Sequence, residues 1–137
     1  MDNPGSSNSA GKLVLIVDDD KDIRDLMADI VRKEGFTVET AADGEEALAK
    51  ARSISPDVIL LDLMLPKYGG FEILHDLQEE ETVNIPIVIM TGHYLDPSTA
   101  DMIRRESNVL DFIEKPIKTE VLMPLLRRRP PRQPSRM

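Results

Sequence analysis

Three short, nearly continuous apolar runs constrain the fold of this sequence more than any other feature. They are rich in β-branched residues and lie at 13–17, 58–61 and 85–90. Strands that are buried on both faces of a parallel sheet have this composition. Two further runs, at 37–41 and 110–114, mix polar with apolar residues, so we expect them at the edges of the same sheet.

Helical periodicity is found between these runs. The first helix is predicted from apolar residues that recur three and four positions apart: Ile23, Leu26, Met27, Ile30 and Val31. Further helices are predicted at 45–53, 71–78 and 98–106, and a last one from 119 onward. This alternation of strands and helices predicts an α/β domain with helices on both faces of a parallel sheet.

The strand order follows from how such sheets are connected. Right-handed crossovers and two half-polar edge strands favour the order 2-1-3-4-5 in a doubly wound five-stranded parallel sheet. A crevice then opens between the carboxyl ends of the first and third strands, where open α/β sheets bind ligands. The 137 residues allow one such domain, predicted at 12–127. We expect the leader (1–11) and the basic tail rich in Pro and Arg (128–137) to be disordered.

Charge and composition exclude several classes of protein. The chain has 25 acidic and 17 basic residues, and five of the arginines lie in the last eleven residues, where no acid occurs. Such an acidic body repels phosphate backbones, so we expect a cation as ligand and no direct nucleic-acid binding. The chain has no cysteine, no apolar run of about 20 residues and no signal-peptide core. We therefore expect a soluble cytoplasmic protein with no membrane contact.

Acidic residues line both sides of the expected crevice. Asp18, Asp19 and Asp20 follow the first strand, and Asp62 ends the third. Two carboxylates about 4 Å apart repel by roughly 4 kcal/mol at an effective dielectric constant of about 20, so such a cluster needs a cation. Oxygen ligands favour Mg²⁺, with Mn²⁺ as the alternative. Asp20 has a second interpretation, because an aspartate in this place also caps the helix that follows.

Two more polar side chains end strands at the same edge of the sheet. Thr91 ends the fourth strand and Lys115 the fifth, so a hydroxyl and an ammonium are added to the carboxylates. Either could alone be part of an ordinary turn or loop. Together with a metal site and a free carboxylate, they make up the groups needed for phosphoryl transfer to an aspartate.

The ordered set of these residues resembles the receiver domains of two-component response regulators. The resemblance covers Lys12 to about Arg127 and implies the flavodoxin-like receiver fold. It rests on the following segments: Val17-Asp18-Asp19, Asp62 with Met64, Leu65 and Pro66, Gly70, Thr91-Gly92 and Lys115-Pro116.

The resemblance implies a role for each acidic residue. Asp62 would accept a phosphoryl group from a phosphohistidine on a sensor histidine kinase or a phosphotransfer protein. Asp18, Asp19, Asp62 and the backbone carbonyl of Met64 would bind Mg²⁺, and Lys115 would contact the phosphoryl group. The protein would catalyse only its own phosphorylation and dephosphorylation, and it would not be an enzyme acting on other substrates.

The resemblance also implies a switch. The Thr91 hydroxyl would move toward the phosphoryl oxygens and act with Phe112 to change the adjacent surface. Met64 and His93 would tune the lifetime of the acyl phosphate, and the Lys115–Pro116 peptide bond would be cis. Read without the resemblance, Phe112 is an ordinary core aromatic and His93 a solvated loop residue.

The output of such a switch would come from an unknown partner or from an output domain that the chain lacks. A phosphorylation-dependent homodimer is a further expectation, but Pro124 puts it in doubt because a proline kinks or shortens a helix. For the basic tail, a linker end and a contact with an acidic partner or with the acidic body both stay open.

Three rival functions remain at this stage. An aspartyl-phosphate phosphatase would need a second aspartate two residues after the nucleophile, where this chain has Met64. A docking module that is never phosphorylated would not need the intact acidic set. A nucleotide-binding flavodoxin-like protein would need a phosphate-binding loop after the first strand, and the aspartates at 18–20 would repel the phosphate.

Overall fold

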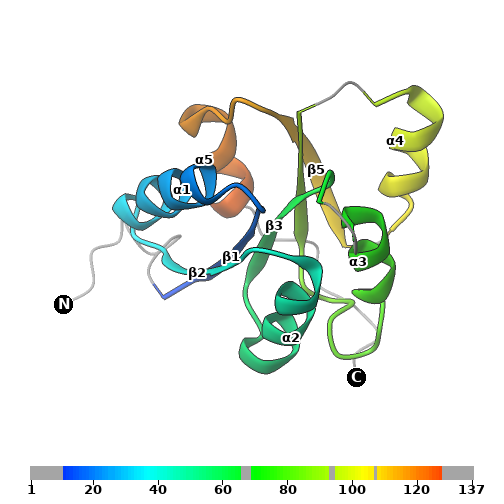
Figure 1. The fold of residues 1–137 in the computed structure, drawn as a ribbon, viewed down its shortest axis with the longest axis horizontal. Helices are drawn as coiled ribbons and strands as arrows, with labels where there is room; N and C mark the ends of the chain where they lie inside the picture. Colours follow the sequence, from blue (N-terminus) through cyan, green and yellow to red (C-terminus); the bar gives the residue numbers. More distant parts are fainter. Residues whose placement is uncertain (1–10, 66–68, 93–94, 107, 128–137) are drawn as a thin grey trace.

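Strands and helices alternate along the whole of the folded chain (Figure 1). The computed structural model describes residues 11–65, 69–92, 95–106 and 108–127. The strands are β1 (Leu13–Val17), β2 (Thr37–Ala41), β3 (Val58–Asp62), β4 (Ile87–Thr91) and β5 (Val109–Glu114). The helices are α1 (Lys21–Lys33), α2 (Gly44–Ile54), α3 (Gly70–Asp76), α4 (Pro97–Arg104) and α5 (Thr119–Arg127). The predicted tail, His93 and all of the leader except Gly11 lie outside the described residues.

The five strands form one parallel sheet in the order β2-β1-β3-β4-β5. This confirms the predicted fold class, strand order and edge strands. The three apolar runs occupy the middle of the sheet because both of its faces are covered, which leaves no polar face for the strands to alternate with.

Several element boundaries differ from the prediction by one or two residues, and two of these differences involve a proline. The strand expected at 85–90 begins at Ile87, because Pro86 has no N–H to donate to the ladder. Ile85, the residue before this proline, belongs to the preceding turn, where its N–H donates to the Thr82 carbonyl. Helix α4 begins at Pro97, which the sequence placed just outside the helix; proline is favoured at a first helical position, where the N–H has no partner.

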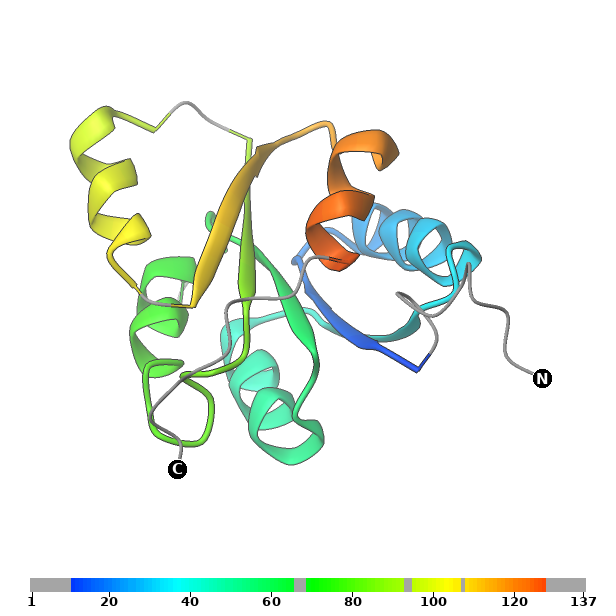
Figure 2. The same cartoon turned by 180° about the vertical axis from the view of Figure 1, so that it is seen from behind.

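Helices cover both faces of the sheet (Figures 1 and 2), and a hydrophobic cluster lies on each face. Helices α1 and α5 cover one face, and α2, α3 and α4 cover the other. In β1, Val14 and Ile16 pack toward α1 and α5, whereas Leu15 and Val17 pack toward the other three helices. No helix within the described ranges has the length and apolar character that crossing a membrane requires.

Helix α5 passes through Pro124 and continues to Arg127. Its apolar side chains on both sides of the proline are buried against the sheet: Leu122, Met123, Leu125 and Leu126. The proline therefore does not end the helix at that position. We attribute this to the apolar face, whose burial continues across the missing hydrogen bond.

A buried amide joins three segments at the amino ends of β4 and β5, which is the end of the sheet away from the carboxylates. The Asn108 side chain donates to the Ile85 carbonyl (2.9 Å) and accepts from the Gln78 amide (3.0 Å). The Asn108 carbonyl accepts from the Ile87 N–H at 2.7 Å. These bonds satisfy the polar groups of the buried Asn108 side chain and its neighbours.

We predict that Asn108→Ala lowers the free energy of unfolding by about 1–3 kcal/mol, because it leaves the buried Ile85 carbonyl without its donor. Urea unfolding measures this change. Gln78→Ala is the matched control, since it keeps that donor in place and should cost less. An Asn108→Ala variant as stable as the wild type would contradict the role of the network.

Candidate functional site

Three aspartates meet where β1 and β3 end. Val17 and Leu61 are register partners, so the residues that follow them, Asp18 and Asp62, leave neighbouring strands at the same edge. One carboxylate oxygen from each of Asp18, Asp19 and Asp62 lies within 4.8 Å of the others. The expected crevice thus brings together the three side chains that the sequence placed there.

The three carboxylates differ in burial. Asp18 is 0% exposed and Asp62 4% exposed, whereas Asp19 is exposed to solvent. Burying a carboxylate costs several kcal/mol unless a partner compensates it. The two inner carboxylates therefore depend on the groups around them, and Asp19 forms the open side of the cluster.

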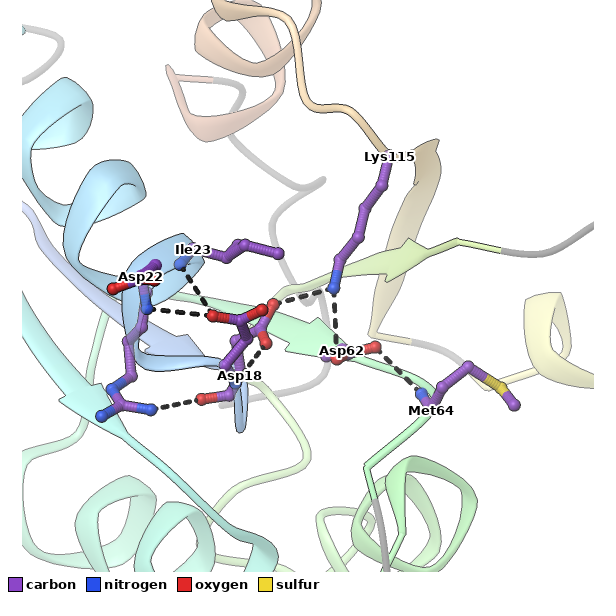
Figure 3. A network of polar contacts seen from close by, with 8 residues as sticks. Asp18, Asp22, Ile23, Asp62, Met64 and Lys115 are labelled. Atoms are coloured by element: carbon purple, nitrogen blue, oxygen red, sulfur yellow. Dashed lines mark hydrogen bonds and ion pairs between the residues drawn. The ribbon is translucent and has the colours of Figure 1, made fainter.

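Lys115 bridges the two buried carboxylates (Figure 3). Its Nζ lies 2.9 Å from Asp18 Oδ2 and 3.3 Å from Asp62 Oδ2. The backbone N–H of Lys115 donates to the Thr91 carbonyl at 2.9 Å, which fixes the start of the lysine side chain beside β4. The Lys115–Pro116 peptide bond is cis, as the resemblance implied.

The charge of Lys115 is held by its partners. Burial alone would lower the pKa of the Lys115 ammonium. The hydrogen bond that the ammonium donates to Asp18 and the negative charges of Asp18 and Asp62 outweigh that effect, so the pKa of Lys115 lies above the ordinary value of 10.5. The lysine therefore stays protonated at neutral pH.

The donor set fits a hard divalent cation. Three carboxylates face one ammonium, so negative charge remains in excess, and two of the three carboxylates are buried. Oxygen ligands suit Mg²⁺, which commonly takes one or two carboxylates and shares its other positions with water and a phosphoryl group. Asp18, Asp19 and Asp62 are the residues that would hold it.

Met64 fixes the second oxygen of Asp62. Its backbone N–H donates to Asp62 Oδ1 at 3.0 Å, so one oxygen of this carboxylate is bound by Met64 and the other by Lys115 (Figure 3). Met64 is 50% exposed, and its side chain points away from the carboxylates (Figure 3). The metal-binding role predicted for its carbonyl stays a prediction.

Thr91 and Phe112 lie at different distances along the sheet from the carboxylates. Thr91 ends β4 and is buried, one residue after Met90, the register partner of Asp62. Phe112 pairs with Ile89, so it lies further from the carboxyl edge and is half-buried on edge strand β5. Phe112 is therefore not a member of the carboxylate cluster.

Asp20 has the capping role that was its second interpretation. Its carboxylate accepts from the backbone N–H groups of Asp22 (3.0 Å) and Ile23 (3.3 Å), which open helix α1. These bonds satisfy two of the free donors of the first turn. The acidic run after β1 is thus divided between the cluster and the helix.

Two contacts at the site were not predicted from the sequence. Arg24 reaches back from α1 and donates to the Asp18 carbonyl at 2.8 Å. Gly70, the first residue of α3, lies against the backbone of Leu63, and a Cβ at Gly70 would stand 2.5 Å from the Leu63 Cα and carbonyl oxygen. Gly70 thus permits α3 to support the segment that carries Asp62 and Met64. The sequence signals were an arginine one turn after the cap and a glycine at a helix start.

Comparison with protein families gives one assignment over most of the chain. Residues 14–127 match the family described as the response regulator receiver domain. The DNA-binding response regulator MtrA of Mycolicibacterium paratuberculosis is 35% identical over 117 residues, which cover 85% of this chain and 50% of the relative. The transcriptional regulatory protein PhoP of Bacillus subtilis is 37% identical over 105 residues, covering 77% of this chain and 42% of the relative. The chain spans about half the length of these curated relatives.

Solved structures of single receiver domains are similar over nearly their whole length. The chemotaxis protein CheY4 of Vibrio cholerae has a TM-score of 0.77 and 33% identity, covering 85% of this chain and 97% of that one. The receiver domain of a sensor histidine kinase from Pseudomonas aeruginosa has a TM-score of 0.75 and 26% identity, covering 85% and 95%. That structure contains a magnesium ion coordinated in its active-site cleft.

The contact between Gly70 and Leu63 yields a prediction. Gly70→Ala should lower the free energy of unfolding by about 1–3 kcal/mol, as overpacking does, because the new methyl meets backbone that cannot turn away. It should also weaken Mg²⁺ binding, since the displaced segment carries Asp62. Chemical unfolding and a Mg²⁺ titration measure the two effects.

Gly92→Ala is the matched control for this prediction. It adds the same methyl group directly after Thr91, where, among the described residues other than its chain neighbours, no atom lies within 4 Å of the new Cβ. This variant should unfold like the wild type. If the two alanine variants were equally stable, the close approach at Gly70 would not be a constraint on the fold.

Proposed function

This chain belongs to the response regulator receiver family, and from that premise we propose that it accepts a phosphoryl group on Asp62 in a Mg²⁺-dependent reaction. The phosphoryl donor is a sensor histidine kinase or a phosphotransfer protein with a phosphohistidine. One observation carries the proposal: Asp62 is a buried carboxylate that shares a cluster with two other aspartates and an ammonium ion. Strand structure alone does not require this cluster.

The position of Asp62 in the sheet favours it over Asp18 as the acceptor. Asp62 ends β3, which lies between β1 with its acidic pair and β4 with Thr91. A phosphoryl group on Asp62 would therefore have cation ligands on one side and a hydroxyl on the other. Asp18 ends the neighbouring strand, whose other partner is edge strand β2.

The transfer itself is a displacement at phosphorus. A carboxylate oxygen of Asp62 attacks the phosphorus, the bond from phosphorus to the histidine nitrogen breaks, and the nitrogen keeps the electron pair. The product is an acyl phosphate on Asp62. A bound Mg²⁺ would neutralise charge on the phosphoryl oxygens, held by Asp18, Asp19, Asp62 and the Met64 carbonyl.

Lys115 and Thr91 act on the oxygens of the transferred group. Phosphorylation removes the negative charge from the Asp62 carboxylate and places charge on the phosphoryl oxygens. The Lys115 ammonium then exchanges its longer bond, the 3.3 Å contact with Asp62, for one to a phosphoryl oxygen, while Asp18 continues to hold it. The Thr91 hydroxyl donates to another oxygen, and with Phe112 it transmits the change to the adjacent surface.

The rest of the proposal concerns turnover and output. Met64 and His93, the second of which lies outside the described residues, tune the lifetime of the acyl phosphate. The output is a surface that binds a partner, an output domain or a second copy of the chain. An output domain is among these because the curated relatives extend well beyond the matched segment. We place the protein in the cytoplasm.

The proposal predicts that acetyl phosphate with Mg²⁺ adds the mass of one phosphoryl group to the intact protein. The adduct should be stable in acid and labile in base. Asp62→Asn should add no such mass, because an amide oxygen is a poor nucleophile, and EDTA should suppress the reaction in the wild type. Intact-protein mass spectrometry measures each of these outcomes.

Asp20→Asn is the control for this experiment. It also turns an aspartate of the same sheet edge into an amide, but its side chain caps α1, so phosphorylation should proceed as in the wild type. Equal incorporation into Asp62→Asn and the wild type, or no incorporation into any of them, would refute the assignment of Asp62.

A further inference from the structure

An arginine of α4 stacks on the aromatic side chain of β5. The Arg104 guanidinium carbon lies 4.6 Å from the centroid of the Phe112 ring, well within the range of a cation–π contact. The other such pair is looser, with Arg127 at 6.0 Å from Phe36, and Arg127 also forms an ion pair with Glu34. The Arg104–Phe112 contact joins the last residue of α4 to an edge strand of the sheet.

The Phe112 ring has open space on another side. An open hollow of about 420 Å³ lies beside it, toward the start of α5. Its lining residues are Phe112, Ile113, Glu114, Lys115, Pro116, Lys118 and Val121. Phe112 thus has a cation on its α4 side and, together with Lys115, lines open space.

We propose that Arg104 is a positioning residue that holds Phe112 against α4 in the unphosphorylated protein and so sets how readily the phosphorylated state forms. The inference rests on the proposed function, since it concerns the same switch. Lys115 is close to both groups: its ammonium binds Asp62, and the residue lines the same hollow as Phe112. A change in the bonds of Lys115 would therefore alter the surroundings of Phe112.

The size of the effect follows from the strength of the contact. Cation–π pairs at exposed positions contribute about 0.5–1 kcal/mol, which corresponds to a roughly two- to fivefold change in an equilibrium constant. If the ring leaves Arg104 when the phosphorylated state forms, loss of the guanidinium favours that state by this factor. By reciprocity, a phosphoryl mimic then binds more tightly by the same factor.

Fluorine NMR tests the inference on the whole chain. The protein contains three phenylalanines, so labelling with 4-fluorophenylalanine gives three resonances, and Phe112→Leu identifies the one that belongs to Phe112. The probe is beryllium fluoride with Mg²⁺, which imitates a phosphoryl group on a carboxylate. Arg104→Met removes the guanidinium and keeps an unbranched side chain, and Arg105→Met removes the same charge from the next position.

In the unliganded protein, Arg104→Met should shift the Phe112 resonance toward its position in the beryllium fluoride complex. The same variant should lower the beryllium fluoride concentration at half-saturation by about two- to fivefold. Arg105→Met should match the wild type in both measurements. In a Phe112→Leu background, Arg104→Met should no longer change the half-saturation concentration.

Two results would overturn the inference, and they can be told apart. If the wild type responds to beryllium fluoride but Arg104→Met behaves like Arg105→Met, Arg104 does not position the ring, while the function proposed for Asp62 stands. If neither the wild type nor any variant responds to beryllium fluoride, the proposed function fails and the inference fails with it. Urea unfolding of each variant checks that the fold is kept.

Discussion

The ion pairs of Lys115 with Asp18 and Asp62 are the interaction on which the site depends. Two carboxylates that are almost fully buried face each other from neighbouring strands, and one ammonium lies within 3.3 Å of both. Without a partner each carboxylate would cost several kcal/mol. The chain meets that cost only in part, because Asp19 adds a further negative charge to the same cluster. A site that is stable yet still short of positive charge is suited to bind a cation and a phosphoryl group in turn.

The topology of the sheet makes this pairing of groups unavoidable. The order β2-β1-β3-β4-β5 sets the ends of β1 and β3 side by side and brings β4 and β5 next to them. Side chains far apart in the sequence therefore meet at one edge of the sheet. The helices on both faces of the sheet cover the strands that lead to this edge. Thr91 lies on β4, Phe112 on β5 and Lys115 just after β5, so the residues of the proposed switch lie on the strands that form the site.

Most of the fold and the composition of the site could be predicted from the sequence, because both depend on patterns within short segments. The central strands are continuous apolar runs, and residues that end parallel strands meet at one edge whatever their side chains do. Contacts between backbone and distant side chains leave no such pattern. Three such contacts join separate segments of the chain, and no periodic pattern predicts them. They are the approach of Gly70 to Leu63, the hydrogen bonds of Asn108 and the stacking of Arg104 on Phe112. The sequence likewise indicated Lys115 as a donor to a phosphoryl group, but not that it bridges the two carboxylates in the unliganded protein.

The most direct test of the central claim is to locate the phosphoryl group chemically in the unmutated protein. Borohydride reduces an aspartyl phosphate to homoserine, which peptide mass spectrometry assigns to one position. After incubation with a small phosphodonor and Mg²⁺, the account predicts homoserine at position 62 and aspartate at 18, 19 and 20. Homoserine at any of those three positions, or a phosphorylated protein that yields no homoserine, would contradict it.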